Sequence, residues 1–345
     1  MKAIVTEVEL KARLAALPRV RLAALPTPLD EAPRLSEALG GPRILIKRDD
    51  LTGLAFGGNK IREFEYSVAP AVQQGCDILL NSAAAQSNQS RQTAAVAARL
   101  GMRSVIIACK DAHSSPIQGN LLLCHLLGAE IHMVERERQK EEKAALIDRL
   151  RAQGHRPWDT GYDGAVFRRV AYVDAFLELW DQLRERDVQP DALYICSGGY
   201  ANVGLVVAAK ALGLDLRIVG INYSVAKDDH EHACRLAAAA KEAADVLGLD
   251  LRFGPEYIEC HSEYVGPAKD IVTDSCREAI QLTARTEGLI LDPVYTGKTM
   301  GALMSHIREG QFSKGQTVVF LHTGGTPALF AFSSELGLDF TDGEW

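Results

Sequence analysis

The 345-residue sequence lacks the features of several common functional classes. No apolar run approaches the ~20 residues that a membrane-spanning helix needs, and the first ten residues alternate charged and apolar positions, so neither a membrane anchor nor a signal peptide is expected. There is no block of basic residues and the net charge is −7, which disfavours nucleic acid or an anionic membrane as a partner. A cytoplasmic protein is expected.

Paired cysteines and familiar catalytic motifs are also missing. The seven cysteines are scattered, odd in number and without a C-x-x-C pair, which is typical of reduced thiols. The absence of a G-x-S-x-G elbow disfavours an α/β-hydrolase. The segment Asp228–Cys234 contains metal-capable side chains, but its H-x-H-x-C spacing matches no common closed zinc site, so no metal is expected.

The sequence does contain short aliphatic runs that alternate with helical stretches. Hydrophobic residues make up 47% of the chain and aromatic residues only 6%, which indicates a large aliphatic α/β core. This alternation predicts a mostly parallel sheet covered by helices, with strands at Ile44–Lys47, Ile78–Asn81, Ser104–Ala108, Glu130–Val134, Ala192–Cys196, Arg217–Asn222 and Thr317–Leu321. We expect a smaller α/β domain of residues 66–170, inserted into a larger cofactor-binding domain of residues 1–65 and 171–345. The densely charged stretch Glu135–Arg151 predicts a solvated surface helix.

Lys60 follows a glycine-rich turn and begins a predicted helix. Asn59 is a good N-cap residue, and apolar residues follow Lys60 at helical spacing. The positive end of the helix dipole disfavours a protonated amine in the first turn. In a dry site this amine could form an imine with an aldehyde; the alternative is a solvated lysine at the start of a helix.

Three later stretches could complete a site around Lys60. In the first, residues 81–92, polar side chains open the helix Arg91–Leu100, and its free N–H groups would suit a carboxylate; the alternative is a plain helix cap. The second, Cys196–Gly204, places glycines between a strand and the helix Val203–Leu212, where backbone N–H groups can bind a phosphate. It is neither a P-loop nor a dinucleotide fingerprint, and a structural tight turn is the alternative.

The third stretch places hydroxyl groups in turns after apolar runs. Tyr295 and Thr296 follow one run, and Thr323 follows the strand Thr317–Leu321. Ligands of open α/β sheets gather at the carboxyl ends of strands. An ordinary packed tyrosine is the alternative for Tyr295.

Together these motifs resemble the fold-type II pyridoxal-phosphate enzymes, specifically the group of 1-aminocyclopropane-1-carboxylate deaminase and D-cysteine desulfhydrase. The resemblance spans most of the chain and rests most specifically on Gly57-Gly58-Asn59-Lys60 and Gln86-Ser87-Asn88, with further support from residues 25–29, 47–51 and 322–328. It implies two open, mostly parallel twisted sheets covered by helices, as in the tryptophan synthase β fold. It also implies a homodimer.

The resemblance further implies roles for individual residues. Lys60 would hold pyridoxal 5'-phosphate covalently and then act as the base at the substrate Cα. The phosphate would be bound by Ser197, Gly198, Gly199, Tyr200, Ala201 and Asn202. Asn88 would contact the ring hydroxyl, and Thr296 and Thr323 would also face the cofactor. Ser87 would lie near the substrate carboxylate or act in proton transfer, and Tyr295 would face the substrate from the other side. Both are expected to be catalytic, and the expected substrate-binding residues are Ser87, Asn88, Gln89, Lys269 and Tyr295.

Two positions favour the desulfhydrase over the deaminase. The deaminase typically has Glu and Leu where this chain has Thr296 and Thr323. A hydroxyl beside the pyridine nitrogen leaves it largely neutral, which is adequate when a good leaving group departs from Cβ but not for ring opening. We therefore predict β-elimination from a small β-substituted amino acid such as D-cysteine, giving pyruvate, ammonia and sulfide, or sulfite from a cysteate-type substrate. The cyclopropane deaminase is the alternative, and a non-catalytic pyridoxal-phosphate or amino-acid-binding protein is a more distant one.

The chain departs from the group at three places. Glu63 stands where the group usually has a lysine near the phosphate, and Tyr200-Ala201 replace the usual Thr-His of the phosphate loop. Lys269 falls where the group commonly has a tyrosine; near the substrate it would favour an anionic β-substituent, and otherwise it would face solvent. Gln89 matches the deaminase.

Overall fold

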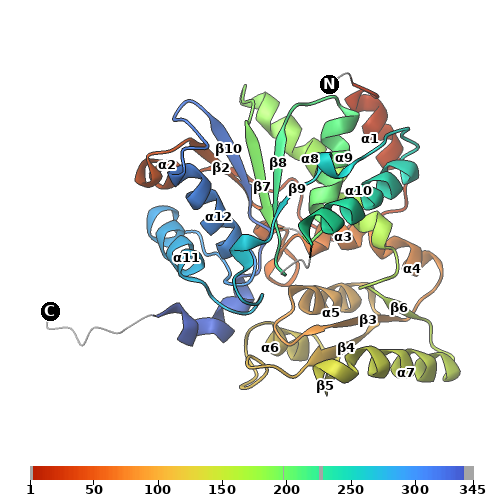
Figure 1. Cartoon of the computed structure of the whole chain (residues 1–345). Helices are drawn as coiled ribbons and strands as arrows, with labels where there is room; N and C mark the ends of the chain where they lie inside the picture. Colours follow the sequence, from red (N-terminus) through yellow and green to blue (C-terminus); the bar gives the residue numbers. More distant parts are fainter. Residues whose placement is uncertain (1–2, 197, 225–227, 338–345) are drawn as a thin grey trace, which may run out of the picture.

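The computed structural model describes residues 3–196, 198–224 and 228–337, which form two sheets covered by helices (Figure 1). The larger sheet has the strand order β1-β2-β10-β7-β8-β9, with β1 (Leu29–Glu31), β2 (Arg43–Lys47), β7 (Ala192–Cys196), β8 (Arg217–Ile221), β9 (Glu259–His261) and β10 (Thr317–Leu321). The smaller sheet has the order β5-β4-β3-β6, with β3 (Ile78–Ala84), β4 (Arg103–Cys109), β5 (Glu130–Val134) and β6 (Pro157–Asp159). Every pairing is parallel except that of β1 with β2. The predicted fold class is confirmed.

Helices cover both faces of each sheet. They are α1 (Glu7–Ala15), α2 (Pro33–Leu39), α3 (Lys60–Ser67), α4 (Ala69–Gln73), α5 (Asn88–Leu100), α6 (Gly119–Leu126), α7 (Gln139–Ala152), α8 (Ala165–Glu185), α9 (Tyr200–Ala211), α10 (Asp229–Val246), α11 (Asp274–Glu287) and α12 (Thr296–Arg308). Short 3-10 turns lie at Asp49–Leu51, Leu54–Phe56, Arg136–Arg138, Pro255–Tyr257, Glu263–Val265 and Thr326–Leu336.

Alternating side chains of the larger sheet separate two cores. Val319 and Leu321 of β10 pack with α8, α9 and α10, whereas Val318 and Phe320 pack on the other face with α2, α11 and α12. This period of two is the direct consequence of strand geometry. In the smaller sheet, Leu79 faces α3 and α5, and the opposite face packs against α7.

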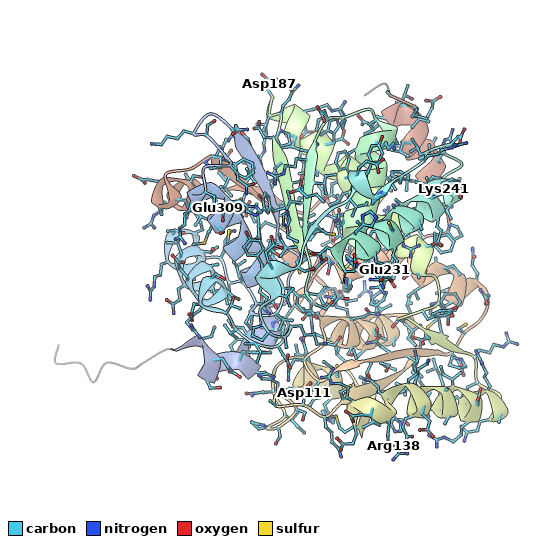
Figure 2. The ribbon with its side chains drawn as sticks, in the orientation of Figure 1. Asp111, Arg138, Asp187, Glu231, Lys241 and Glu309 are labelled. Carbon is cyan, nitrogen blue, oxygen red and sulfur yellow. The ribbon has the colours of Figure 1, made fainter. Side chains whose placement is uncertain are left out.

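All seven predicted strands are present, and the charged stretch forms a short turn and α7 at the surface, where Figure 2 shows Arg138 at the outer edge of the molecule. Helices α5 and α9 begin at Asn88 and Tyr200, before the predicted Arg91 and Val203. The smaller sheet lies within residues 78–159 and the larger one uses residues 29–47 and 192–321, while α8 continues across residue 170. The exact division into domains stays a prediction.

Candidate active site

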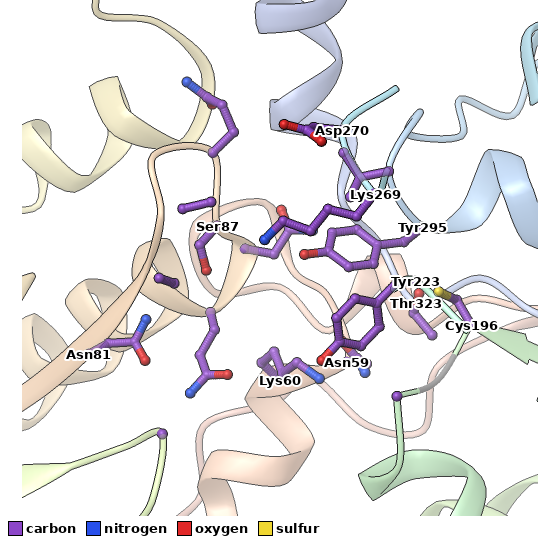
Figure 3. A pocket seen from close by; sticks show the side chains of 18 of the residues that line it. Asn59, Lys60, Asn81, Ser87, Cys196, Tyr223, Lys269, Asp270, Tyr295 and Thr323 are labelled. Carbon is purple, nitrogen blue, oxygen red and sulfur yellow. The ribbon is translucent and has the colours of Figure 1, made fainter. Parts of the chain in front are cut away.

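A cavity of about 370 Å³ lies where the carboxyl ends of strands from both sheets meet. Asn81 and Ala84 of β3 line it from the smaller sheet, and Cys196 at the end of β7 and Thr323 after β10 line it from the larger one. Its volume is in the usual range for small-molecule sites, roughly 300–1,000 Å³. Figure 3 shows the polar side chains that project into it.

Lys60 enters this cavity as the first residue of α3. The preceding turn needs glycine, because Gly58 has φ +117° and an added Cβ would lie 2.3 Å from Nε2 of Gln92. The Asn59 N–H donates to the Thr323 carbonyl at 3.0 Å, which ties the turn to the end of β10. The lysine side chain keeps 24% of its surface exposed and forms part of the cavity lining.

The predicted capping role of Asn59 is wrong, although the helix begins where expected. Asn59 itself has helical dihedral angles, φ −57° and ψ −28°, and its side chain makes no capping hydrogen bond. Instead its amide Nδ2 donates to Glu63 Oε1 at 3.3 Å. The Asn59 side chain therefore hydrogen-bonds to the carboxylate one turn later and caps no backbone N–H group.

A buried carboxylate joins Lys60 to an arginine. The Lys60 amine donates to Glu63 Oε1 at 2.8 Å, and Arg168 of α8 donates to Glu63 Oε2 from Nε at 2.6 Å and contacts it from Nη2 at 2.5 Å. Burial lowers the pKa of the Lys60 amine, an effect that the Glu63 charge opposes and the Arg168 charge reinforces. Burial alone would raise the pKa of Glu63, but the charges of Arg168 and Lys60 outweigh it and hold that pKa below its usual value. The lowered pKa of Lys60 favours a nucleophilic amine.

Ser87, Asn88 and Gln89 all line the cavity at the start of α5. Ser87 Oγ accepts a hydrogen bond from the Ser90 N–H at 3.2 Å, so this serine is a helix cap whose own O–H can still donate. Gln89 Oε1 accepts from Arg168 at 3.2 Å. Ser87 therefore caps α5 and also lines the cavity, so both interpretations hold.

The glycine turn after β7 faces the same cavity. Gly198, Gly199, Tyr200 and Ala201 line it, and a Cβ at Gly198 would lie 2.2 Å from the ring of Tyr223. Helix α9 begins at Tyr200, so its first backbone N–H groups lie at the cavity wall.

Of the other two residues of the predicted phosphate loop, only Asn202 belongs to the described part of the chain, and it does not face the cavity. Ser197 lies outside the described residues. Asn202 is buried but is not among the lining residues, and its side chain lies over β8, where a Cβ at Gly220 would come within 2.2 Å of its Nδ2.

Tyr295 faces the cavity, whereas Thr296 does not. The Tyr295 ring contacts the Tyr223 ring edge to face, with centroids 5.6 Å apart. Burial raises the pKa of the Tyr295 hydroxyl, so the hydroxyl stays protonated near neutral pH and can donate a hydrogen bond. Thr296 is buried away from the lining residues, with its hydroxyl donating to Asp292 Oδ1 at 2.8 Å. The structure thus brings Thr323 but not Thr296 to the cavity.

Lys269 lies opposite Ser87, and a buried lysine of α12 anchors the loop that carries it. Figure 3 shows Lys269 and Tyr295 projecting from one side of the cavity and Ser87 from the other. Lys298 of α12 is buried and donates from Nζ to the carbonyls of Val265, Ala268 and Lys269 at 2.6, 3.1 and 3.0 Å. One buried cation therefore fixes the loop that carries Lys269.

The remaining chemistry-bearing groups have limited roles. Cys196 lines the cavity, but burial raises its pKa to about 12, so its thiol is protonated and is a poor nucleophile.

Among the described residues, no three His, Cys, Asp or Glu side chains gather as a metal site. In residues 3–196, 198–224 and 228–337 no helix is both long and apolar enough to cross a bilayer.

Sequence reasoning missed several residues of the site. Arg168, Tyr223 and Asp270 line the cavity, with Asp111, His113 and Phe332. Tyr223 could have been found, because it lies two residues beyond β8 at the carboxyl edge of the sheet. Arg168 gave no such signal, since it lies within a helix and meets Glu63 only through the fold.

Comparisons with known proteins agree with this geometry. The family profile described as pyridoxal-phosphate dependent enzyme matches residues 20–324. D-cysteine desulfhydrases of Salmonella typhi and Salmonella newport (strain SL254) are 36% identical over 326 residues, which is 92% of this chain and 97% of each relative. A crystal structure titled as an ACC deaminase homologue superposes with a TM-score of 0.85 at 30% identity, covering 96% of this chain and 99% of the other.

Proposed function

Since the chain belongs to the pyridoxal-phosphate dependent enzymes, we propose that it catalyses β-elimination from a small β-substituted amino acid, with D-cysteine as the leading substrate. The observation that carries this proposal is the position of Lys60, whose amine opens into a cavity with Ser87 and Tyr295 on its other walls. For D-cysteine, one water is consumed and pyruvate, ammonia and hydrogen sulfide are released. We also propose a cytoplasmic homodimer; the free cysteines agree with a reducing compartment.

The lining residues fit pyridoxal phosphate. The amine of Lys60 can bond covalently to an aldehyde. Gly198 and Gly199 leave no side chain between the first N–H groups of α9 and the cavity, and a Cβ at Gly198 would clash with Tyr223. Helix N-termini with such glycines are favourable phosphate sites. We propose that Gly198, Gly199, Tyr200 and Ala201 hold the phosphate, with Asn88 and Thr323 beside the ring.

The cofactor, when bound, supplies an electron sink for the charge that develops at Cα. With the substrate amine in its place on the cofactor, the Lys60 amine would act as general base at the α-proton, a role that the direction of its pKa shift favours. The start of α5 binds the substrate carboxylate, where Ser87 can donate its O–H. Tyr295, whose hydroxyl stays protonated at neutral pH, donates a proton or hydrogen bond from the opposite side.

Lys269 supports a finer choice of leaving group. Its ammonium lies among the lining residues beside Tyr295, where it would attract an anionic β-substituent such as a sulfonate. We propose cysteate-type amino acids, with sulfite as the leaving group, as the second substrate class. The deaminase alternative is disfavoured because Thr323, which stands where that enzyme typically has Leu, lines the cavity; Thr296, the other such position, does not line it.

The test is a substrate panel in which ketoacid release is measured for both enantiomers of cysteine and cysteate, for serine, and for the cyclopropane amino acid. We expect pyruvate with sulfide from D-cysteine, and no turnover by Lys60→Ala. Release of 2-oxobutyrate from the cyclopropane substrate, without pyruvate from the others, would establish the deaminase instead. A cofactor-loaded protein that turns over none of them would favour a binding protein.

A further inference from the structure

Arg168 is a buried cation at the cavity whose position the reaction described above does not explain. Its residue is 1% exposed, yet it belongs to the lining of the cavity. Glu63 compensates its charge through Nε and Nη2, which makes the burial of both groups tolerable. Nη2 also donates to Gln89 Oε1, and Nη1 makes only a long contact, 3.4 Å, with the Thr160 carbonyl. The Nη1 side of the guanidinium therefore keeps donor capacity.

The guanidinium lies over the side chain of the residue that directly follows the two glycines of the turn. Its Cζ is 4.1 Å from the centroid of the Tyr200 ring, and Tyr200 is the first residue of α9. The backbone of this residue, with Gly198 and Gly199, forms the cavity wall that suits a phosphate. Arg168 thus adds a full positive charge and planar donors beside the N-terminus of a helix.

The other cationic side chains that line the described cavity have roles away from the phosphate. Lys60 must give its amine to the aldehyde carbon of the cofactor. Lys269 projects beside Tyr295, toward Ser87 (Figure 3). Among the described lining residues, Arg168 is the remaining permanent cation. A cation stabilises a bound phosphate dianion more strongly than it stabilises a neutral ligand.

From these contacts we infer that Arg168 binds the phosphate of the cofactor, together with the backbone of residues 198–201. This inference rests on the proposed function, because it assigns the cofactor to the cavity. It adds a side-chain cation, supplied by α8, to a phosphate site otherwise built from backbone N–H groups.

The experiment compares the affinity of the cofactor-depleted enzyme for pyridoxal phosphate and for pyridoxal, which lacks the phosphate, by calorimetric titration. The variants are Arg168→Met, the double variant Glu63→Gln/Arg168→Met and the matched control Arg169→Met. Arg169 also lies over the Tyr200 ring, at 5.6 Å, but pairs with Glu242 and does not line the cavity. The double variant keeps the net charge of the wild type and leaves no unpaired buried carboxylate, so it guards against misfolding.

We expect the preference for pyridoxal phosphate over pyridoxal to fall about 10- to 100-fold in both Arg168 variants, as for loss of a charge-assisted hydrogen bond, and to stay unchanged in Arg169→Met. If the affinities for both ligands fell equally, or if the folded double variant kept its preference for pyridoxal phosphate, the result would show that Arg168 only packs against Tyr200. A wild-type protein that binds neither compound would instead overturn the proposed function itself.

Discussion

Replacing Glu178 with glutamine should destabilise the protein in a pH-dependent way. Glu178 of α8 accepts hydrogen bonds from Lys47 at 2.5 Å and from Arg62 at 2.7 and 3.0 Å. Lys47 and Arg62 are only 1% and 2% exposed, and Arg62 lies on α3, two residues after Lys60. Glutamine would keep the shape of the side chain but remove a charge that compensates Lys47 and, together with Asp49, also compensates Arg62.

The magnitude follows from the pKa of Glu178. Burial alone would raise this pKa, but hydrogen bonds and charges from Arg62 and Lys47 outweigh burial and lower it from 4.5 to about 2. At 1.36 kcal/mol per pKa unit, ionised Glu178 contributes about 3 kcal/mol at neutral pH. Because the folded-state pKa is the lower one, this contribution is complete above the unfolded-state value and is lost as the pH falls from about 5 toward 2.

Urea unfolding at pH 7 and pH 3.5 would test this. We expect Glu178→Gln to lower the free energy of unfolding by about 3 kcal/mol at pH 7 and by about 2 kcal/mol at pH 3.5. Glu31→Gln is the matched control, because Glu31 pairs with Arg43 at the surface, where both side chains are 44% exposed, and should change stability by less than about 1 kcal/mol. A Glu178 variant no less stable than the control, or equally destabilised at both pH values, would refute the reasoning.

Three further predictions concern the cavity. Borohydride reduction of the cofactor-loaded protein should label Lys60, as peptide mass spectrometry would show; Lys60→Ala should remain unlabelled and inactive. Tyr295→Phe should lower kcat about 10²- to 10⁴-fold, as for loss of a proton-transfer group, and Ser87→Ala should raise KM, as for loss of a hydrogen bond to the substrate carboxylate, while cofactor absorbance persists in both; unchanged steady-state constants would exclude these roles. Glu63→Gln should lower the pKa of Lys60 further, because the Glu63 charge opposes the effect of burial; the pH midpoint of cofactor attachment should fall relative to wild type, and a rise would contradict this.

The fold could be predicted well because its strands are aliphatic runs buried on both faces. Val318 to Leu321 illustrate this, since adjacent residues face different cores and all four must be apolar. The unpredicted strands β1, β6 and β9 have three residues each and lie at sheet edges, where polar residues are tolerated and the pattern is too short to read. The family comparisons confirm the resemblance on which the predicted cofactor depended.

The site was predictable only where its residues follow strands or open helices. Lys60, Ser87 and Gly198 occupy such positions, and all three line the cavity. Arg168 was not predictable, because its pairing with Glu63 joins residues far apart in sequence within two helices. The expected N-cap of Asn59 failed for the same reason, since the carboxylate that captures its amide is held by that arginine.

The anchoring of residues 265–269 by Lys298 has a consequence for the side chain at position 269. Lys298 and Tyr295 lie at the start of one helix, so the loop bearing Lys269 is fastened to the same support as the tyrosine. Three main-chain oxygens bind the ammonium, and none of these bonds depends on the side chain at position 269. The side chain at position 269, which we propose selects the leaving group, can therefore change without altering the main-chain contacts that hold its loop.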